Sequence, residues 1–207
     1  MLITAVEPRR KALSALYIDG EFALKLDTET LIANHIEPGV ELDDEELREL
    51  IKKSDAKRAK EKALWLISYR DHSEKELVDK IKKDYSEESA ISAVNRMKEL
   101  GLVNDENFAR RYFKSLTEGS KQLSPTCAKY KLLEKGIDRS LVDIIVEECD
   151  VDQHQQIRNI IEKKYRNFTT DEKYRRRAVA GLQRKGFRWD DIKSVMSEYE
   201  NEDDYGY

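Results

Sequence analysis

The sequence predicts a mainly α-helical protein, with three tandem three-helix repeats in an elongated curved array behind a small N-terminal cap that contains a β-hairpin. A tripeptide pattern recurs about every 50 residues, as Lys83-Asp84-Tyr85, Lys135-Gly136-Ile137 and Lys185-Gly186-Phe187. Such self-similarity is typical of stacked units that bury apolar faces against their neighbours. Hydrophobic and charged residues each make up 39% of the chain, with only three prolines and eight glycines. This composition suits an elongated helical protein better than one large spherical core.

The N-terminal cap is expected to mix strands and helices. Leu13–Ile18 and Glu21–Leu26 flank Asp19-Gly20, and this dipeptide between β-favouring runs indicates a hairpin with a type I′ turn. The other expected elements are a strand at residues 2–6, a short helix at 28–34, a turn at 38–39 and a helix that begins at Asp43.

Helix caps and turns divide the rest of the chain, which is expected to be helical from a helix near residues 55–70 onward. Ser73 with Glu76 has the spacing of a capping box, and Ser124-Pro125 places proline at the first position of a helix. Gly101 and Gly136 are expected to end helices. The predicted domains are residues 1–53 for the cap, 54–104, 105–150 and 151–200 for the repeats, and 201–207 for an acidic tail. The alternative, nine unrelated helices in one bundle, leaves the shared spacing unexplained.

Charge is distributed unevenly along the chain, although the net charge is only −4. Residues 1–104 carry 18 Lys and Arg against 22 Asp and Glu, giving −4, whereas residues 105–193 carry 20 against 15, giving +5. Residues 194–207 carry five acids and no bases, giving −5. Such asymmetry often accompanies contact with nucleic acid or an acidic partner, although well-solvated charged helices also explain it.

Basic side chains are expected on the helix faces opposite the apolar stripes. On the helix near 105–118, the wheel separates Arg110, Arg111 and Lys114 from an apolar side that comprises Phe108, Ala109, Tyr112, Phe113 and Leu116. Lys131 and Lys135 share a face of the next helix. Like charges at this spacing are mildly destabilising, so a partner rich in phosphates or carboxylates would stabilise them.

The helix near 171–185 repeats this separation. Tyr174, Ala178 and Leu182 are expected to face inward, with Arg175 at the border. The outward face is expected to carry Arg176, Arg177 and Arg184. Basic faces on successive repeats favour a shared binding surface over three separate solvated faces.

No motif indicates catalysis, a cofactor or a metal site. The sequence has no Gly-rich phosphate loop, no Gly-x-Ser-x-Gly and no His-Glu-x-x-His, and the Lys-Gly pairs follow helices, not strands. Cys127 and Cys149 are interpreted as free thiols of a reducing compartment. We find no signal-peptide pattern and no apolar run of the roughly 20 residues that a membrane helix needs, so we expect a soluble, cytoplasmic monomer.

Several motifs, taken in order, resemble the RecX family, the bacterial regulators of the RecA recombinase. They are Tyr69-Arg70-x-x-Ser73-x-x-Glu76-Leu77, then Leu100-Gly101-Leu102-Val103-Asn104-Asp105-x-x-Phe108-Ala109, then Lys135-Gly136-Ile137. Residues 17–23, 30–31 and 39–42 resemble the extended form of Gram-positive members. The resemblance covers most of the chain and is weakest in the third repeat. Asp84, in place of the later glycines, and Arg188, in place of a capping residue, depart from the pattern and put local helix geometry in doubt.

This resemblance implies binding to the groove of the RecA nucleoprotein filament, with inhibition of strand exchange and of ATP hydrolysis by RecA, in recombination, DNA repair and the SOS response. It brings no catalytic residues and no cofactor. We expect the following basic residues to contact RecA or single- or double-stranded DNA: Arg70, Arg110, Arg111, Lys114, Lys131, Lys135, Arg175, Arg176, Arg177, Arg184 and Lys185.

Other functions fit parts of the pattern. A helical-repeat protein could bind DNA on its own, although the negative total charge disfavours strong affinity, or could serve as a general protein-interaction scaffold. An RNA-binding repeat is a third alternative, without support from the placement of aromatic residues. The acidic C-terminal tail, from Glu198 to Tyr207, is expected to be mobile and either solubilises the protein or competes with anionic ligands for the basic repeats.

Overall fold

The hairpin predicted at Asp19-Gly20 opens the fold. In the computed structural model, which describes the backbone of residues 1–204 and the side chains of residues 1–199, a three-stranded antiparallel sheet has the order β1-β2-β3. Its strands are β1 (Ile3–Pro8), β2 (Leu13–Ile18) and β3 (Glu21–Asp27). Asp19 and Gly20 have φ values of +50° and +88°, the left-handed region that a type I′ turn needs at both positions.

Asp27 joins the sheet to the first two helices. Its carboxylate caps α1 (Thr28–Ala33) by accepting a bond of 2.9 Å from the Thr30 N–H. The same oxygen lies 2.8 Å from the Lys57 Nζ, and the Asp27 N–H donates to the Ser54 Oγ at 2.8 Å. Burial alone would raise the pKa of Asp27, but the bonds from Lys57 and Thr30 outweigh it and lower that pKa.

Helix α2 (Asp44–Tyr69) corrects two expectations. Two helices were predicted, one that begins at Asp43 and one near 55–70, with the boundary between cap and first repeat at 53/54. They form one helix of 26 residues, capped by Asp43. No glycine or proline interrupts residues 44–69, so nothing in the backbone ends the helix there. The predicted boundary therefore lies inside α2, whose Leu50 packs in the cap while Ala63 packs in the first repeat.

A buried histidine lies in the connection between α2 and α3 (Glu74–Ile81). The His72 side chain is only 3% exposed, and its Nδ1 lies 3.2 Å from the Glu76 Oε2. Burial, together with the nearby positive charge of Arg70, lowers the pKa of His72 more than Glu76 raises it. His72 is therefore held in the neutral form, beside the residue that caps α3, Ser73.

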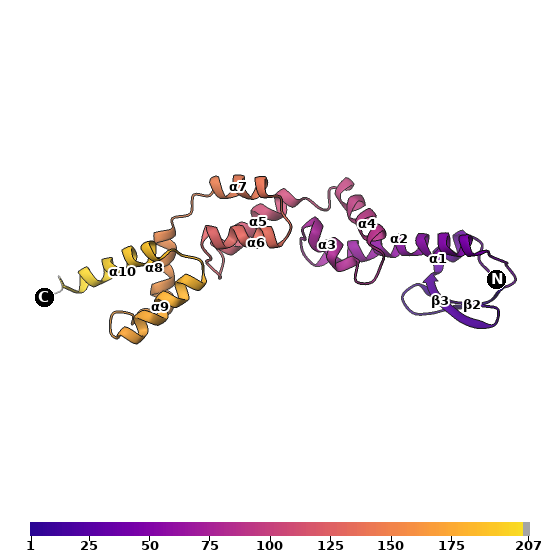
Figure 1. The fold of residues 1–207 in the computed structure, drawn as a ribbon, viewed down its shortest axis with the longest axis horizontal. Coiled ribbons are helices and arrows are strands. Elements are labelled where there is room, and N and C mark those ends of the chain that lie inside the picture. Colours follow the sequence, from indigo (N-terminus) through magenta and orange to yellow (C-terminus); the bar gives the residue numbers. More distant parts are fainter. Residues whose placement is uncertain (205–207) are drawn as a thin grey trace. The chain divides into compact units, whose positions relative to one another are not determined.

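Each three-helix repeat has its own cluster of buried side chains. The first comprises the C-terminal part of α2 with α3 and α4 (Glu87–Glu99). The second comprises α5 (Asp105–Thr117), α6 (Pro125–Glu134) and α7 (Arg139–Glu147). The third comprises α8 (Gln153–Lys164), α9 (Glu172–Arg184) and α10 (Trp189–Asp204). Figure 1 shows these helices in chain order. The predicted caps Ser73 and Ser124 begin α3 and α6, and Ser86 and Asp138 cap α4 and α7 in the same way.

The chain divides into two units, residues 1–104 and residues 105 onward. The second and third repeats thus belong to one unit. Of the predicted acidic tail, Glu198 lies within α10, which the structure follows to Asp204, and residues 205–207 lie outside the described residues. Within residues 1–204, every helix is too short or too polar to cross a bilayer.

The Lys-Gly turn of the third repeat lies against the first turn of α6. The Ser124 N–H donates to the Lys185 carbonyl at 2.9 Å, and the Ser124 Oγ donates to the Gly186 carbonyl at 2.8 Å. The carbonyl end of α9 thereby meets the N-terminal end of α6, a favourable pairing of opposite helix dipole ends. Another hydrogen bond also joins the two repeats: the buried Gln156 amide donates to the Thr117 carbonyl at 2.8 Å.

Gly186 is required at this contact for two reasons. Its φ is +88°, a conformation that disfavours side chains. A Cβ at this position would also lie 2.6 Å from both the Cys127 Cβ and the Ser124 Oγ. Gly101 ends α4 with a φ of +71° but has nothing within 4 Å of its Cβ position. Substitutions at these two glycines can therefore distinguish the cost of backbone strain from the cost of a steric clash.

Replacing Asp27 should destabilise the N-terminal unit. We expect Asp27→Ala to lower its free energy of unfolding by about 2 kcal/mol, below the full cost of breaking a buried ion pair because Lys57 is partly solvated. The matched control is Glu29→Ala, which removes the exposed second partner of Lys57 and should cost no more than about 0.5 kcal/mol. Urea denaturation followed by circular dichroism measures both, and equal losses would contradict the role given to Asp27.

Replacing Gly186 should loosen the contact between the second and third repeats. Gly101→Ala adds only backbone strain, about 1 kcal/mol, whereas Gly186→Ala adds the same strain and a clash, so we expect at least twice the loss of stability. Amide hydrogen exchange gives the local readout, because the Cys127 N–H is bonded to the Ser124 Oγ. Exchange at Cys127 should accelerate in Gly186→Ala and stay unchanged in Gly101→Ala; an unchanged rate in both would refute the contact.

Acidification should weaken the N-terminal unit through His72. Because the folded pKa lies below the ordinary value of 6.5, the unfolded chain takes up the proton first as the pH falls. Stability is therefore fully present above about pH 6.5 and is lost as the pH falls toward the folded pKa. Chemical denaturation between pH 7.5 and 5 should show a steeper decline for the wild type than for His72→Gln, and parallel declines would exclude His72 as the cause.

Candidate functional site

The predicted basic faces of the second repeat lie on its surface. Arg110, Arg111 and Lys114 are exposed on α5, opposite the buried Phe108 and Phe113. The sequence therefore predicted the two sides of this helix correctly. Whether these cations can bind a partner also depends on the acidic side chains around them.

Acidic neighbours engage many of the predicted cations. Arg110 is paired with Glu106 at 3.0 Å and with Glu148, the C-cap of α7, and the bonds from Glu148 and Glu106 raise the pKa of Arg110. Four further pairs are Arg70–Glu76 at 2.7 Å, Lys114–Glu118 at 3.6 Å, Lys131–Glu134 at 2.8 Å and Arg176–Glu172 at 3.0 Å. Exposed pairs of this kind contribute little to stability, so a partner can exchange them, but each acid reduces the local positive charge.

The remaining predicted residues have varied surroundings. The Lys135 Nζ lies 5.9 Å from the centre of the Tyr112 ring, a cation–π distance. Lys185 is half-buried and donates to the Lys121 carbonyl. Arg175 is half-buried, as expected for the border of α9, while Arg177 and Arg184 are exposed.

Tyr174 corrects the prediction for α9. It was expected to face inward with Ala178 and Leu182, which are buried, but its side chain is 46% exposed. The aromatic rings buried in the core of the third repeat are those of Phe187 and of Phe168, which lies in the loop between α8 and α9 and meets Tyr199 edge to face. Tyr174 therefore lies on the same outward side of α9 as Arg177, three residues further on.

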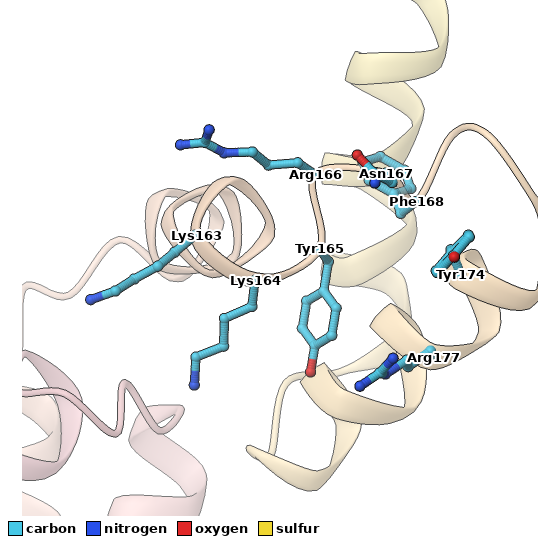
Figure 2. A pocket seen from close by; sticks show the side chains of 8 residues that line it. All are labelled: Lys163, Lys164, Tyr165, Arg166, Asn167, Phe168, Tyr174 and Arg177. Atoms are coloured by element: carbon cyan, nitrogen blue, oxygen red, sulfur yellow. The ribbon is translucent and has the colours of Figure 1, made fainter.

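A basic pocket opens where α8 ends and α9 begins. Its volume is about 360 Å³, and Figure 2 shows the side chains that line it: Lys163, Lys164, Tyr165, Arg166, Asn167, Phe168, Tyr174 and Arg177. Four of these eight are cations and three are aromatic. Among the residues that the structure describes, no acidic side chain lines it.

The cations of this pocket differ from those of the second repeat. Among residues 1–199, no carboxylate pairs with Lys163, Lys164 or Arg177. Arg166 uses its Nε to bond the Glu162 carbonyl at the end of α8, which leaves its terminal N–H groups for other acceptors. Positive side chains also stabilise the negative end of α8, so part of this charge has a structural role.

Tyr165 has a fixed position in this pocket. Its hydroxyl lies so close to α9 that a Cβ on the buried Gly181 would come within 2.1 Å of it. Figure 2 shows the Lys164 and Tyr165 side chains pointing the same way, with the Arg177 guanidinium beside the Tyr165 ring, whereas Lys163 and Arg166 extend away. Lys164 and Arg177 thus flank a ring that the packing holds in place.

Lys185 lies close enough to this pocket to be affected by its charge. Burial, and then repulsion from Lys164, lower the pKa of Lys185. An anion bound beside Lys164 would reduce this repulsion.

Three of the pocket cations were missed in the sequence. Lys163, Lys164 and Arg166 form a run with Tyr165 at the end of a predicted helix, and the sequence analysis used only the apolar pattern of that helix. The run itself was the available signal. The sequence alone could not show that Arg177 lies beside this run, because a loop separates the two helices.

The acidic residue that opens the predicted tail already has a partner. The Arg158 guanidinium contacts the Glu198 carboxylate with its Nε at 3.0 Å and one terminal nitrogen at 3.3 Å. The Tyr199 hydroxyl lies 3.3 Å from the Glu162 carboxylate. This part of α10 therefore packs on α8, and its first acid does not reach into the basic pocket.

Two of the three repeats match known family models. Residues 59–97 match the first three-helix domain of RecX, and residues 150–196, which include most of the basic pocket, match the third. The chain is also similar to solved structures: a crystal structure of regulatory protein RecX (TM-score 0.61, 22% identity, 95% of this chain and 98% of that one) and RecX from Lactobacillus salivarius (TM-score 0.58, 26% identity, 70% and 97%).

Similarity to curated sequences extends over nearly the whole chain. Regulatory protein RecX of Caldanaerobacter subterraneus subsp. tengcongensis is 32% identical over 95% of this chain and 99% of its own length. That of Bacillus velezensis is 32% identical over 91% and 74%, and that of Clostridioides difficile is 27% identical over 99% and 98%. The helical repeats, the N-terminal sheet and this end-to-end similarity agree: the chain belongs to the RecX family of regulatory proteins.

Proposed function

We propose that this protein binds the RecA nucleoprotein filament and inhibits the recombinase and ATPase activities of RecA during homologous recombination and DNA repair. In this proposal it acts as a cytoplasmic monomer and by occupying a surface, without chemistry of its own. The relatives' shared name, regulatory protein RecX, supports a regulatory role. Beyond this regulatory role, we propose the partner, which is the RecA filament, and the direction of the effect, which is inhibition.

The observation that carries the proposal is the basic surface of the second and third repeats. Residues 105–193 hold 20 Lys and Arg against 15 Asp and Glu, and four cations of the third repeat line one pocket that has no acidic side chain among the described residues. A filament of protein on DNA offers both phosphates and carboxylates, which bind Arg and Lys through charge-assisted hydrogen bonds.

Inhibition would follow from several weak contacts acting together. The second and third repeats form one unit through Ser124 and Gly186, so contacts made by α5 and by α9 are not independent. Once one face is bound, the other meets its target at high effective concentration. A protein held this way in the filament groove would hinder the protomer movements that ATP hydrolysis and strand exchange require.

The predicted residues differ in whether an acidic side chain already pairs with them. Arg110 and Arg176 must give up acidic partners before they bind a filament, whereas Arg177 has no such competitor among the described residues. We therefore expect Arg177 and its neighbours in the third repeat to contribute more than Arg110. A general interaction scaffold would show no such dependence on the basic faces.

Reversing charge on α9 should weaken inhibition of RecA. We expect Arg176→Glu/Arg177→Glu to raise the concentration needed for half-inhibition of RecA ATP hydrolysis on single-stranded DNA about tenfold, the effect of losing two contacts of about 0.7 kcal/mol each. The salt dependence of inhibition should become shallower in the same variant.

The control is a variant with the same change in net charge in the N-terminal unit, Arg48→Glu/Arg96→Glu, which alters two exposed arginines of α2 and α4. It should inhibit within about twofold of the wild type, since its sites lie outside the proposed surface. Equal losses in the two variants would show that only net charge matters. A wild-type protein without effect on RecA would overturn the proposed function.

A further inference from the structure

We infer that the pocket between α8 and α9 binds one nucleotide of single-stranded DNA, with its phosphate contacted by Lys164 and Arg177 and its base against the ring of Tyr174. This deepens the proposed function, on which it rests for its setting in the filament. It assigns a specific role to residues that the basic faces alone do not distinguish.

The cations of the pocket fit a phosphate. Lys164 and Arg177 come from two different helices, line the same pocket and have no carboxylate partner among residues 1–199. Elsewhere in this unit the structure neutralises comparable cations, as Glu106 and Glu148 do for Arg110 and Glu198 does for Arg158. Among the described residues, this pocket gathers four cations and no acidic side chain, so a bound anion would relieve repulsion there.

The neighbouring Lys185 supports this assignment. Its ammonium is half-buried, and it is disfavoured by burial and by Lys164. A phosphate beside Lys164 would lower the local positive potential and would raise the pKa of Lys185 toward its ordinary value.

The exposed tyrosine fits a base. Tyr174 is 46% exposed although it belongs to a helix with a well-formed apolar side, and it lies one turn before Arg177 on α9. Single-stranded nucleic acids bind where aromatic rings stack on bases and cations follow the backbone. Tyr165, whose hydroxyl packs against Gly181, adds a second aromatic ring to the lining.

The ring distinguishes the possible anions. The bases of a duplex are stacked on each other, so a duplex would meet the cations but not Tyr174. An acidic peptide likewise has carboxylates for Lys164 and Arg177 but no planar base. Of these three ligands, only a single strand has groups for both the cations and the Tyr174 ring.

The test is binding of the full chain to a fluorescent oligo-dT of about 12 nucleotides, without RecA, measured by anisotropy across a salt series. We expect Lys164→Gln/Arg177→Gln to lower affinity at least tenfold and to reduce the slope of log K against log salt by about 1.4, two contacts at about 0.7 each. Tyr174→Ala should lower affinity about fivefold or more, while Tyr174→Phe, which keeps the ring, should bind like the wild type.

Arg188→Gln is the control. It removes one exposed arginine of the third repeat, at a position that does not line the pocket and is not among the proposed contacts. Its affinity and salt slope should stay within about twofold of the wild type. Circular dichroism confirms that each variant keeps its helix content before binding is compared.

Four outcomes would overturn the inference: wild-type binding by Lys164→Gln/Arg177→Gln, equal losses in Arg188→Gln and Arg177→Gln, no loss in Tyr174→Ala, or competition by polyglutamate or duplex DNA as effective as by oligo-dT. The RecA ATPase assay separates this result from the proposed function. A pocket variant that loses oligo-dT but still inhibits RecA supports the nucleotide site and moves filament binding elsewhere. If the wild-type protein does not inhibit RecA, the proposed function is refuted, but the oligo-dT result still stands.

Discussion

The contact between the Gly186 turn and the first turn of α6 is the constraint on which the C-terminal unit depends. The turn presents carbonyl groups of Lys185 and Gly186 to the N–H and hydroxyl of Ser124, and the absence of a side chain at Gly186 lets the backbones approach. Because this contact joins the second repeat to the third, the basic residues of α5 and α9 belong to one body. The Lys-Gly pattern that marks the repeats in sequence therefore has two roles: it ends a helix, and in the third copy it builds the junction.

Local signals accounted for most of the fold. Asp19-Gly20, Ser124-Pro125 and Gly136 act through their own backbone conformations or through the next few residues, so sequence alone located their turns and caps. The continuity of α2 followed from an absence of breakers, which a repeat-based division overlooked. Phe168 reaches the core of the third repeat from a loop, so helical periodicity could not place it, and the same periodicity wrongly assigned the exposed Tyr174 to the core.

The candidate site was less predictable because its electrostatics are non-local. Arg110 and Glu148 are 38 residues apart, and only the fold shows that the acid neutralises the predicted cation. The reverse holds at the end of α8, where Lys164 has Arg177 and Lys185 as neighbours and, among the described residues, no acidic side chain lines the pocket. A count of basic residues thus points to residues 105–193, while the difference between paired and unpaired cations among the described residues favours the third repeat within them.

Site-specific photo-crosslinking to preformed RecA filaments tests the central claim, that the basic surface of the third repeat faces the filament. A photoreactive amino acid in place of Lys163, at the rim of the pocket, is compared with the same residue in place of Glu147, which is exposed on α7. The account predicts crosslinks to RecA or to its DNA from position 163 and few from position 147. Equal crosslinking from both positions, or crosslinking from position 147 alone, would contradict it.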